Sequence, residues 1–194
     1  PISFYPFISL VFSYPPLYNY RCIANLEENE VYLCSFYLYC NFLILFLILT
    51  IPILIVEWII GKFAPNARDI SSLRIVQWGF KVIKITGVKT TVIGEENIPD
   101  EAVLFVGNHR SYFDILLTYS RCKRLTGYVA KKEMEKYLTL TTWMRRLYCL
   151  FLDRSDPKQG LKTILTAIDY IKRGISICIF PEGTRNTGAE LSLL

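Results

Sequence analysis

Hydrophobic residues are unevenly spread along the chain, and their spacing predicts two kinds of structure. The first is an uncharged run over residues 31–56. As one continuous helix at about 1.5 Å per residue it would be about 39 Å long, enough to cross a lipid bilayer. Pro52 predicts a kink in this run, so a helix that enters one leaflet and bends back out is an alternative. A buried core helix is a third interpretation.

The segments around this run predict a membrane-proximal part of the chain. Residues 62–87 mix apolar side chains such as Trp78 with basic ones such as Arg74, a pattern typical of a basic helix lying at the membrane interface. Residues 1–30 form an N-terminal extension without an assigned function, since prolines near its start exclude a spanning helix. We therefore expect a transmembrane or membrane-embedded helix at 31–61 and an interfacial helix at 62–87.

From residue 88 onward the pattern changes to short apolar runs that alternate with helical stretches, which predicts an α/β domain over 88–194. The expected strands are 88–93, 102–107, 127–130, 149–152 and 175–180. Apolar residues from Leu161 to Ile171 recur at helical spacing, and Gly174 is expected to end that helix. Because this helix connects the last two strands, we expect them to form a parallel pair in a mostly parallel sheet flanked by helices.

Charge divides the chain in the same way. Residues 1–61 carry net charge −3 and residues 62–194 carry +8, within a total of +5 at neutral pH and a mean hydropathy of +0.31. Basic residues after the apolar run predict that the C-terminal part lies on the cytoplasmic side of a cell membrane. The basic residues are not interleaved with aromatic ones, so nucleic acid is not an expected partner.

Several residue counts limit the chemistry. His109 is the single histidine, which excludes a metal site built from several histidines, and the six cysteines contain no C-x-x-C pair. We therefore expect no metal, and no cofactor is expected either. The first methionine is Met134, which predicts a fragment or an unusual translation start.

Polar residues follow three of the expected strands, where parallel strands place functional loops. His109 follows one strand directly, and Asp114 lies in the first turn of the next expected helix and could reach back to it. Such a carboxylate fixes the imidazole tautomer and leaves the other ring nitrogen free to accept a proton. The alternative is structural, because Ser111-x-x-Asp114 also resembles a capping box.

A second cluster has the chemistry of a phosphate clamp. After the last strand, Gly183 lets backbone N–H groups approach an anion, Thr184 adds a hydroxyl, and Arg185 adds a planar guanidinium. The alternative is a tight turn with a solvated arginine. Arg154 follows another strand, and it too has a structural alternative, an ion pair with Asp153. The signatures of serine hydrolases, P-loop enzymes and Rossmann oxidoreductases are not found in the sequence.

Together these motifs resemble those of the glycerolipid acyltransferases, especially bacterial-type 1-acyl-sn-glycerol-3-phosphate (lysophosphatidic acid) acyltransferases. The residues His109-x-x-x-x-Asp114 are similar to the first family motif, and residues 180–185 (F-P-E-G-T-R) to the third. Residues 152–154 are similar to the second motif, and residues 130–133 (A-K-K-E) to a further family segment. The family chain normally continues beyond F-P-E-G-T-R, so the resemblance also predicts a domain that is incomplete at its C-terminus.

The resemblance implies acyl transfer from acyl-CoA or acyl-carrier protein to the sn-2 hydroxyl of lysophosphatidate at the membrane, giving phosphatidate for phospholipid synthesis. His109 would be the general base, oriented by Asp114 and supported by Asn108. The phosphate would be held by Arg154, Gly183, Thr184 and Arg185, with Glu182 ordering this clamp and Lys131 assisting. Alternatives are a related acyltransferase with another acceptor, such as glycerol 3-phosphate or another lysophospholipid, and an inactive membrane-tethered fragment.

Overall fold

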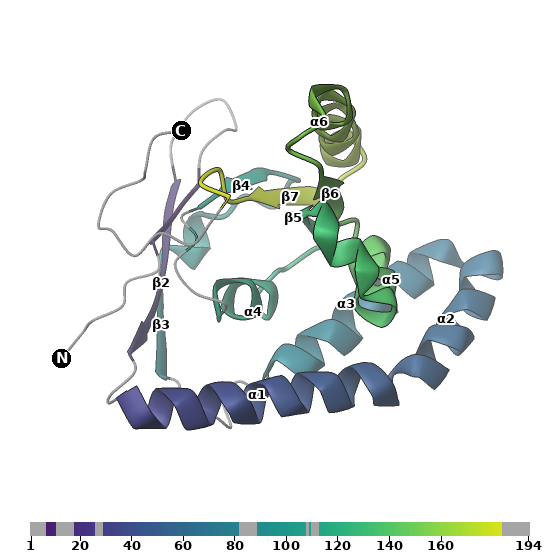
Figure 1. Ribbon diagram of the computed structural model, residues 1–194. Helices are drawn as coiled ribbons and strands as arrows, with labels where there is room; N and C mark the ends of the chain where they lie inside the picture. Colours follow the sequence, from purple (N-terminus) through teal and green to yellow (C-terminus); the bar gives the residue numbers. More distant parts are fainter. Residues whose placement is uncertain are drawn as a thin grey trace.

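The protein is a mixed α/β structure in which a parallel sheet is flanked by helices (Figure 1). The computed structural model describes residues 7–10, 18–25, 29–81, 89–107, 109 and 113–183. Its helices are α1 (Asn29–Leu49), α2 (Ile51–Phe63), α3 (Pro65–Lys81), α4 (Phe113–Tyr119), α5 (Leu138–Arg146) and α6 (Pro157–Lys172). Short 3-10 helices, η2 (Glu95–Asn97) and η3 (Lys132–Lys136), follow β3 and β5.

The uncharged run does not form one straight helix. It is divided between α1 and α2, which are bent by 49° at the break around Thr50. Pro52 lies in the first turn of α2, and because it has no N–H the carbonyl of Ile48 loses its helical partner there. The predicted kink is therefore confirmed. Among the described helices none is by itself both long and apolar enough to cross a membrane, while the bent pair Cys40–Leu49 and Ile51–Phe63 meets that test jointly, by length and composition.

Two sheets are present in the described part of the chain. Strands β1 (Phe7–Leu10), β2 (Tyr18–Asn25) and β3 (Lys89–Ile93) form an antiparallel sheet in that order. The expected strand at 88–93 is thus present, but it pairs with β2 from the N-terminal extension and not with the parallel strands. A strand pattern specifies an extended segment without specifying its neighbour, which explains why the sequence did not predict this pairing.

The second sheet carries the strand ends at which the functional loops were expected. Its strands β4 (Leu104–Val106), β7 (Ser176–Ile179), β5 (Thr126–Lys131) and β6 (Leu150–Leu152) are parallel and lie in that order. The last two strands of the chain are parallel, as predicted, but they are not a pair, because β5 lies between them. At Gly127 the backbone of β5 lies so close to the segment before β6 that a Cβ would collide with the Tyr148 carbonyl.

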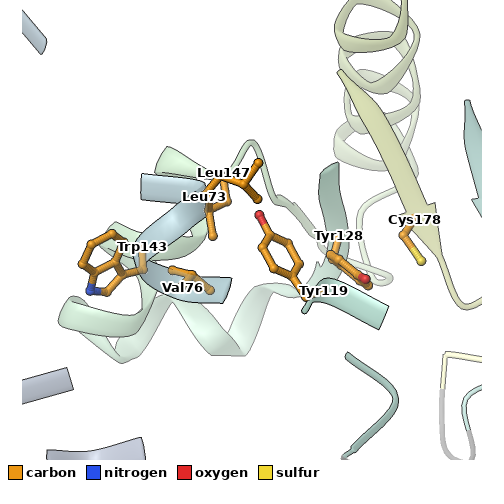
Figure 2. Packing of buried hydrophobic residues seen from close by; sticks show 7 residues of the cluster. All are labelled: Leu73, Val76, Tyr119, Tyr128, Trp143, Leu147 and Cys178. Carbon is orange, nitrogen blue, oxygen red and sulfur yellow. The ribbon is translucent and has the colours of Figure 1, made fainter. Parts of the chain in front are cut away.

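The main core lies on one face of the parallel sheet and joins it to the N-terminal helices (Figure 2). Its buried residues come from α3, α4, β5, α5, β7 and the turn after α5: Leu73, Val76, Tyr119, Tyr128, Trp143, Leu147 and Cys178. Desolvation in this core raises the pKa of the Cys178 thiol well above its usual range. Two core residues of α3, Leu73 and Val76, are buried against the α/β part, while Ile70 and Trp78 of the same helix are exposed.

Helix α6 lies on the opposite face of the sheet (Figure 1). It ends as predicted, with Gly174 at φ +85° after its last turn. Its apolar stripe, however, does not face the sheet: Leu161, Ile164, Leu165 and Ile168 are exposed. The small Gly160 faces β6, where a Cβ would lie 3.8 Å from Leu152 Cδ1, and Thr163 is a buried residue of this helix.

A buried polar network ties the bent helix pair to α5. Glu57 of α2 is 2% exposed and accepts hydrogen bonds from Ser71 Oγ (2.5 Å) and Ser72 Oγ (2.6 Å) of α3. It also accepts one from Arg146 Nη1 of α5 at 2.6 Å. The charge that follows the uncharged run therefore points into the protein, where an arginine and two hydroxyls compensate its burial.

Candidate active site

His109 and Asp114 meet at the carboxyl end of β4. His109 follows this strand, Asp114 lies in the first turn of α4, and His109 Nδ1 is 2.9 Å from Asp114 Oδ2. Asp114 is 1% exposed, while the imidazole keeps a partly exposed surface. The contact expected from the sequence is therefore present.

This geometry determines which imidazole nitrogen is available for chemistry. An ionised carboxylate only accepts hydrogen bonds, so Nδ1 is the nitrogen that donates its hydrogen to Asp114. Nε2 then carries the lone pair. A histidine held in this tautomer can accept a proton from a hydroxyl group placed within hydrogen-bonding distance of Nε2.

Phe180 connects His109 with the last strand of the sheet. Its ring stacks on the imidazole with centroids 4.7 Å apart and an interplanar angle of 20°. Because Phe180 directly follows β7, this contact brings the residues after β7 next to the end of β4. Phe180 also packs against Tyr128 of the core, so the stacked imidazole rests on a buried aromatic layer.

Gly183 and Arg154 form a second polar corner at the same sheet edge. Gly183 has φ +59°, a left-handed conformation that glycine adopts without steric cost. The Arg154 guanidinium occupies the space in which a side chain at this position would begin, so a Cβ there would overlap it. The glycine is therefore required both by its backbone angle and by the arginine above it.

Glu182 is buried beside this corner. It is 6% exposed, and in the described part of the structure neither carboxylate oxygen has a hydrogen-bond partner. Buried carboxylate oxygens ordinarily accept hydrogen bonds, because leaving them unsatisfied costs free energy. Glu182 thus supplies two acceptor atoms that the described protein groups leave unused.

The predicted lysine and the residue next to it have different surroundings. Lys131 is the last residue of β5 and its side chain is exposed. Lys132 donates to Asp153 Oδ2 at 2.8 Å, and this bond together with those from Ser155 holds the pKa of the Asp153 carboxyl well below its usual range. Among the described residues Asp153 thus pairs with Lys132 and not with Arg154, which corrects the structural alternative considered for Arg154.

The structure brings together His109 with Asp114, and Arg154 with Gly183, after three strands, β4, β6 and β7, at one sheet edge. The predicted site residues Asn108, Thr184 and Arg185 lie outside the described residues, as does Ser111 of the alternative capping interpretation. No group of three or more His, Cys, Asp or Glu side chains that could hold a metal ion occurs among the described residues.

Sequence reasoning missed two residues that contact this site or its supporting loop. Phe180 is part of the F-P-E-G-T-R segment, but nothing in its spacing indicates that it stacks on the histidine. Gln159 hydrogen-bonds the backbone on both sides of Leu152, and no sequence signal distinguishes it from other polar residues of an exposed helix turn. Phe180 contacts a residue that is far away in the sequence, and Gln159 joins a helix to the end of a strand.

At the carboxyl edge of a parallel sheet, where α/β proteins place functional loops, this α/β protein has an imidazole–carboxylate pair that can accept a proton and an arginine–glycine corner that presents a cation. Residues 89–193 match the family model described as "Acyltransferase". The chain belongs to this acyltransferase family, and its curated relatives place it among the glycerolipid acyltransferases.

The chain is similar to three curated proteins in particular. It is 31% identical over 138 residues to the probable 1-acyl-sn-glycerol-3-phosphate acyltransferase of Mycoplasma pneumoniae, covering 66% of this chain and 49% of the relative. It is 30% identical over 118 residues to the 1-acyl-sn-glycerol-3-phosphate acyltransferase of Saccharomyces cerevisiae, covering 59% and 39%. It is 32% identical over 114 residues to the protein of the same name from Pseudomonas aeruginosa, covering 58% and 43%.

The chain spans about half the length of the Mycoplasma pneumoniae relative, 49% of it. No solved structure gives a significant match.

Proposed function

We propose that the protein transfers an acyl group from a thioester, acyl-CoA or acyl-carrier protein, to the sn-2 hydroxyl of lysophosphatidate, forming phosphatidate. The observation that carries this proposal is the 2.9 Å His109–Asp114 pair at the same sheet edge as the Arg154–Gly183 corner. A base and a cationic corner at one edge suit an alcohol that also bears a phosphate. The names of the curated relatives support the same acceptor.

His109 acts as the general base in the proposed reaction. Nε2 accepts the proton of the sn-2 hydroxyl while its oxygen attacks the thioester carbonyl, and Asp114 stabilises the imidazolium that forms. The tetrahedral intermediate then collapses, the carbon–sulfur bond breaks, and the departing thiolate takes the proton from the imidazolium. The ester is formed directly, so the enzyme carries no acyl group.

The phosphate of the acceptor is held by the second corner. Arg154 supplies a planar guanidinium, which lies against the Gly183 backbone because no side chain there displaces it. Thr184, Arg185 and Lys131 add a hydroxyl and two cations in this proposal, and Glu182 orders the clamp. Asn108 supports the loop that carries His109. The reaction requires no metal and no cofactor beyond the acyl donor.

We further propose that the bent α1–α2 pair embeds the protein in the cytoplasmic face of a cell membrane, with α3 as the basic helix of the interface. Exposed apolar side chains on α2, among them Ile55, Trp58 and Phe63, support this position. Lys62 Nζ lies 3.8 Å from the Trp58 ring centroid, and such aromatic and basic side chains are common at the lipid–water boundary. Membrane embedding would present the site to an acceptor whose acyl tail lies in lipid.

The proposal is tested by assaying the intact protein for phosphatidate formation from lysophosphatidate and acyl thioester. We expect His109→Ala and Asp114→Asn to lower kcat by roughly 10²–10⁴-fold, because the base or its orienting partner is lost. Asp169→Asn is the matched control, since this carboxylate of α6 is exposed and pairs only weakly with Arg173. Undiminished turnover in His109→Ala would contradict the mechanism, and a wild-type protein that forms no phosphatidate would contradict the function.

A further inference from the structure

Arg154 follows a strand that has a neighbour on one side only. Strand β6 is the edge of the parallel sheet and pairs with β5 alone. The outward-facing backbone groups at its end, the Phe151 carbonyl and the Asp153 N–H, therefore have no strand partner in the described structure. An unpaired strand end is free to fray, and fraying would move the arginine next to it.

Gln159 supplies the missing partner. This residue lies in the first turn of α6, and its Nε2 donates to the Phe151 carbonyl at 2.7 Å. Its Oε1 accepts from the Asp153 N–H at 2.9 Å. A neighbouring parallel strand would bond the same two groups, the C=O of one residue and the N–H of the residue two positions later. The side-chain amide of Gln159 therefore takes the place of one residue of such a strand.

The turn beyond Asp153 is held from other directions as well. The Asp153 carboxylate accepts from Lys132 Nζ (2.8 Å), the Ser155 N–H (2.9 Å) and Ser155 Oγ (2.5 Å). Asp156 caps α6 by accepting from the Gln159 N–H at 3.2 Å, which fixes the backbone of Gln159 itself. Arg154 thus stands between two residues with fixed backbones, while its own side chain is exposed except where the guanidinium covers Gly183.

We propose that Gln159 is a positioning residue for Arg154: its amide completes the edge of β6 and so holds the guanidinium over Gly183, where it binds the acceptor phosphate. This inference rests on the proposed function. Gln159 does not contact the substrate, and its effect reaches the phosphate only through the backbone at 151–153. Loss of the Gln159 amide should therefore weaken binding of the acceptor more than it slows the chemical step.

The test uses Gln159→Met in the intact protein, which keeps an unbranched side chain of high helix propensity but removes both hydrogen bonds. We expect the KM for lysophosphatidate to rise about tenfold, as for two lost hydrogen bonds, with the KM for the acyl thioester and kcat nearly unchanged. Thr166→Val is the matched control, because it removes a side-chain bond to the Lys162 carbonyl within the same helix and leaves β6 untouched.

A double-mutant cycle with Arg154→Ala separates positioning from general structural damage. If Gln159 acts through Arg154, Gln159→Met changes the acceptor KM less than about twofold once Arg154 is absent. If the two substitutions instead raise the acceptor KM independently, so that their fold-changes multiply in the double variant, the inference is overturned. An acceptor KM that rises in Arg154→Ala but not in Gln159→Met would overturn it too, while leaving the proposed function intact.

Two further measurements can overturn the inference. If Arg154→Ala leaves the acceptor KM unchanged, the proposed phosphate site fails and this inference fails with it. Should Gln159→Met not fold, hydrogen exchange of the wild-type protein decides: the Asp153 amide must be protected, and exchange at the rate of an unstructured chain would overturn the proposed bond.

Discussion

Gly183 adopts φ +59°, and the guanidinium of Arg154 lies where its side chain would begin. Two physical requirements thus converge on one residue. The backbone angle disfavours any residue with a Cβ, and the cation would be displaced even if the strain were tolerated. These effects can be separated, because the chain contains a second glycine with the first requirement alone.

We expect Gly183→Ala to raise the KM for lysophosphatidate at least tenfold, since the new methyl group displaces Arg154 from the proposed phosphate position. Gly174→Ala is the matched control: Gly174 has φ +85°, but a Cβ there meets nothing within 4 Å. Both variants should lose about 1 kcal/mol of stability from backbone strain. Steady-state kinetics with both substrates and thermal unfolding measure the two effects, and equal acceptor KM values in the two variants would contradict the assignment.

Residue spacing predicted one part of the site well and another not at all. The five-residue interval from His109 to Asp114 predicted their contact, because a strand end followed by a helix start is a local geometry. Gln159 and Phe151 are also close in sequence, but their bond depends on how α6 folds back along the edge strand. The orientation of α6 along β6 is a tertiary property, and no residue type in this segment predicts it.

Among the elements, α2 and α5 are joined by a charge pair that both helices bury. Glu57 and Arg146 lie 2.6 Å apart, and Arg146 also donates to the Leu54 carbonyl at 2.7 Å. Trp143 of α5 donates to Thr50 at the helix break (3.1 Å), so α5 holds both the break and the helix after it. The bent helix pair is therefore a packed part of the fold.

Breaking this pair on one side should be costly. We expect Glu57→Ala to lower the free energy of unfolding by about 3–5 kcal/mol, because Arg146 and two serine hydroxyls lose their buried acceptor. The double variant Glu57→Leu with Arg146→Met should be more stable than Glu57→Ala, since it leaves no buried charge without a partner. Chemical denaturation in detergent measures both values.

The exposed pair Asp169–Arg173 provides the control for that experiment. Its atoms are 3.5 Å apart at the surface, so Asp169→Ala should change stability by less than about 1 kcal/mol. A Glu57→Ala variant as stable as Asp169→Ala would show that the buried network contributes little. The sequence predicted the break at Pro52, but the ion pair of Glu57 with Arg146 could not be predicted, because the two residues lie far apart in the sequence.

Two sets of exposed apolar residues lie on helices that Figure 1 places on opposite sides of the molecule. One set lies on the N-terminal helices and the other on α6, with the parallel sheet between them. Only the N-terminal set is accompanied by the bent helix pair that could enter a bilayer. If membrane embedding is the role of that set alone, the two surfaces should respond differently to polar substitution.

We expect Ile55→Ser with Ile59→Ser to weaken binding to anionic lipid vesicles about tenfold or more, because two exposed apolar side chains of α2 lose their transfer energy. Ile164→Ser with Ile168→Ser is the matched control, one helical turn apart and similarly exposed on α6. Vesicle flotation measures the bound fraction of each. Equal losses in the two variants, or no loss in the first, would contradict the proposed membrane face.

The sequence by itself determined the local features of this protein: the helix break at Pro52, the strands of the α/β part, the end of α6 at Gly174, and the spacing that lets Asp114 reach His109. Each depends on backbone preferences or on neighbours within a few residues. Only the tertiary structure decided that β5 separates β6 from β7, that β3 pairs with the N-terminal β2, that Phe180 stacks on His109, and that Gln159 bonds the backbone next to Arg154. These depend on which distant surfaces pack together, and a pattern of apolar residues specifies that a surface is buried without specifying its partner.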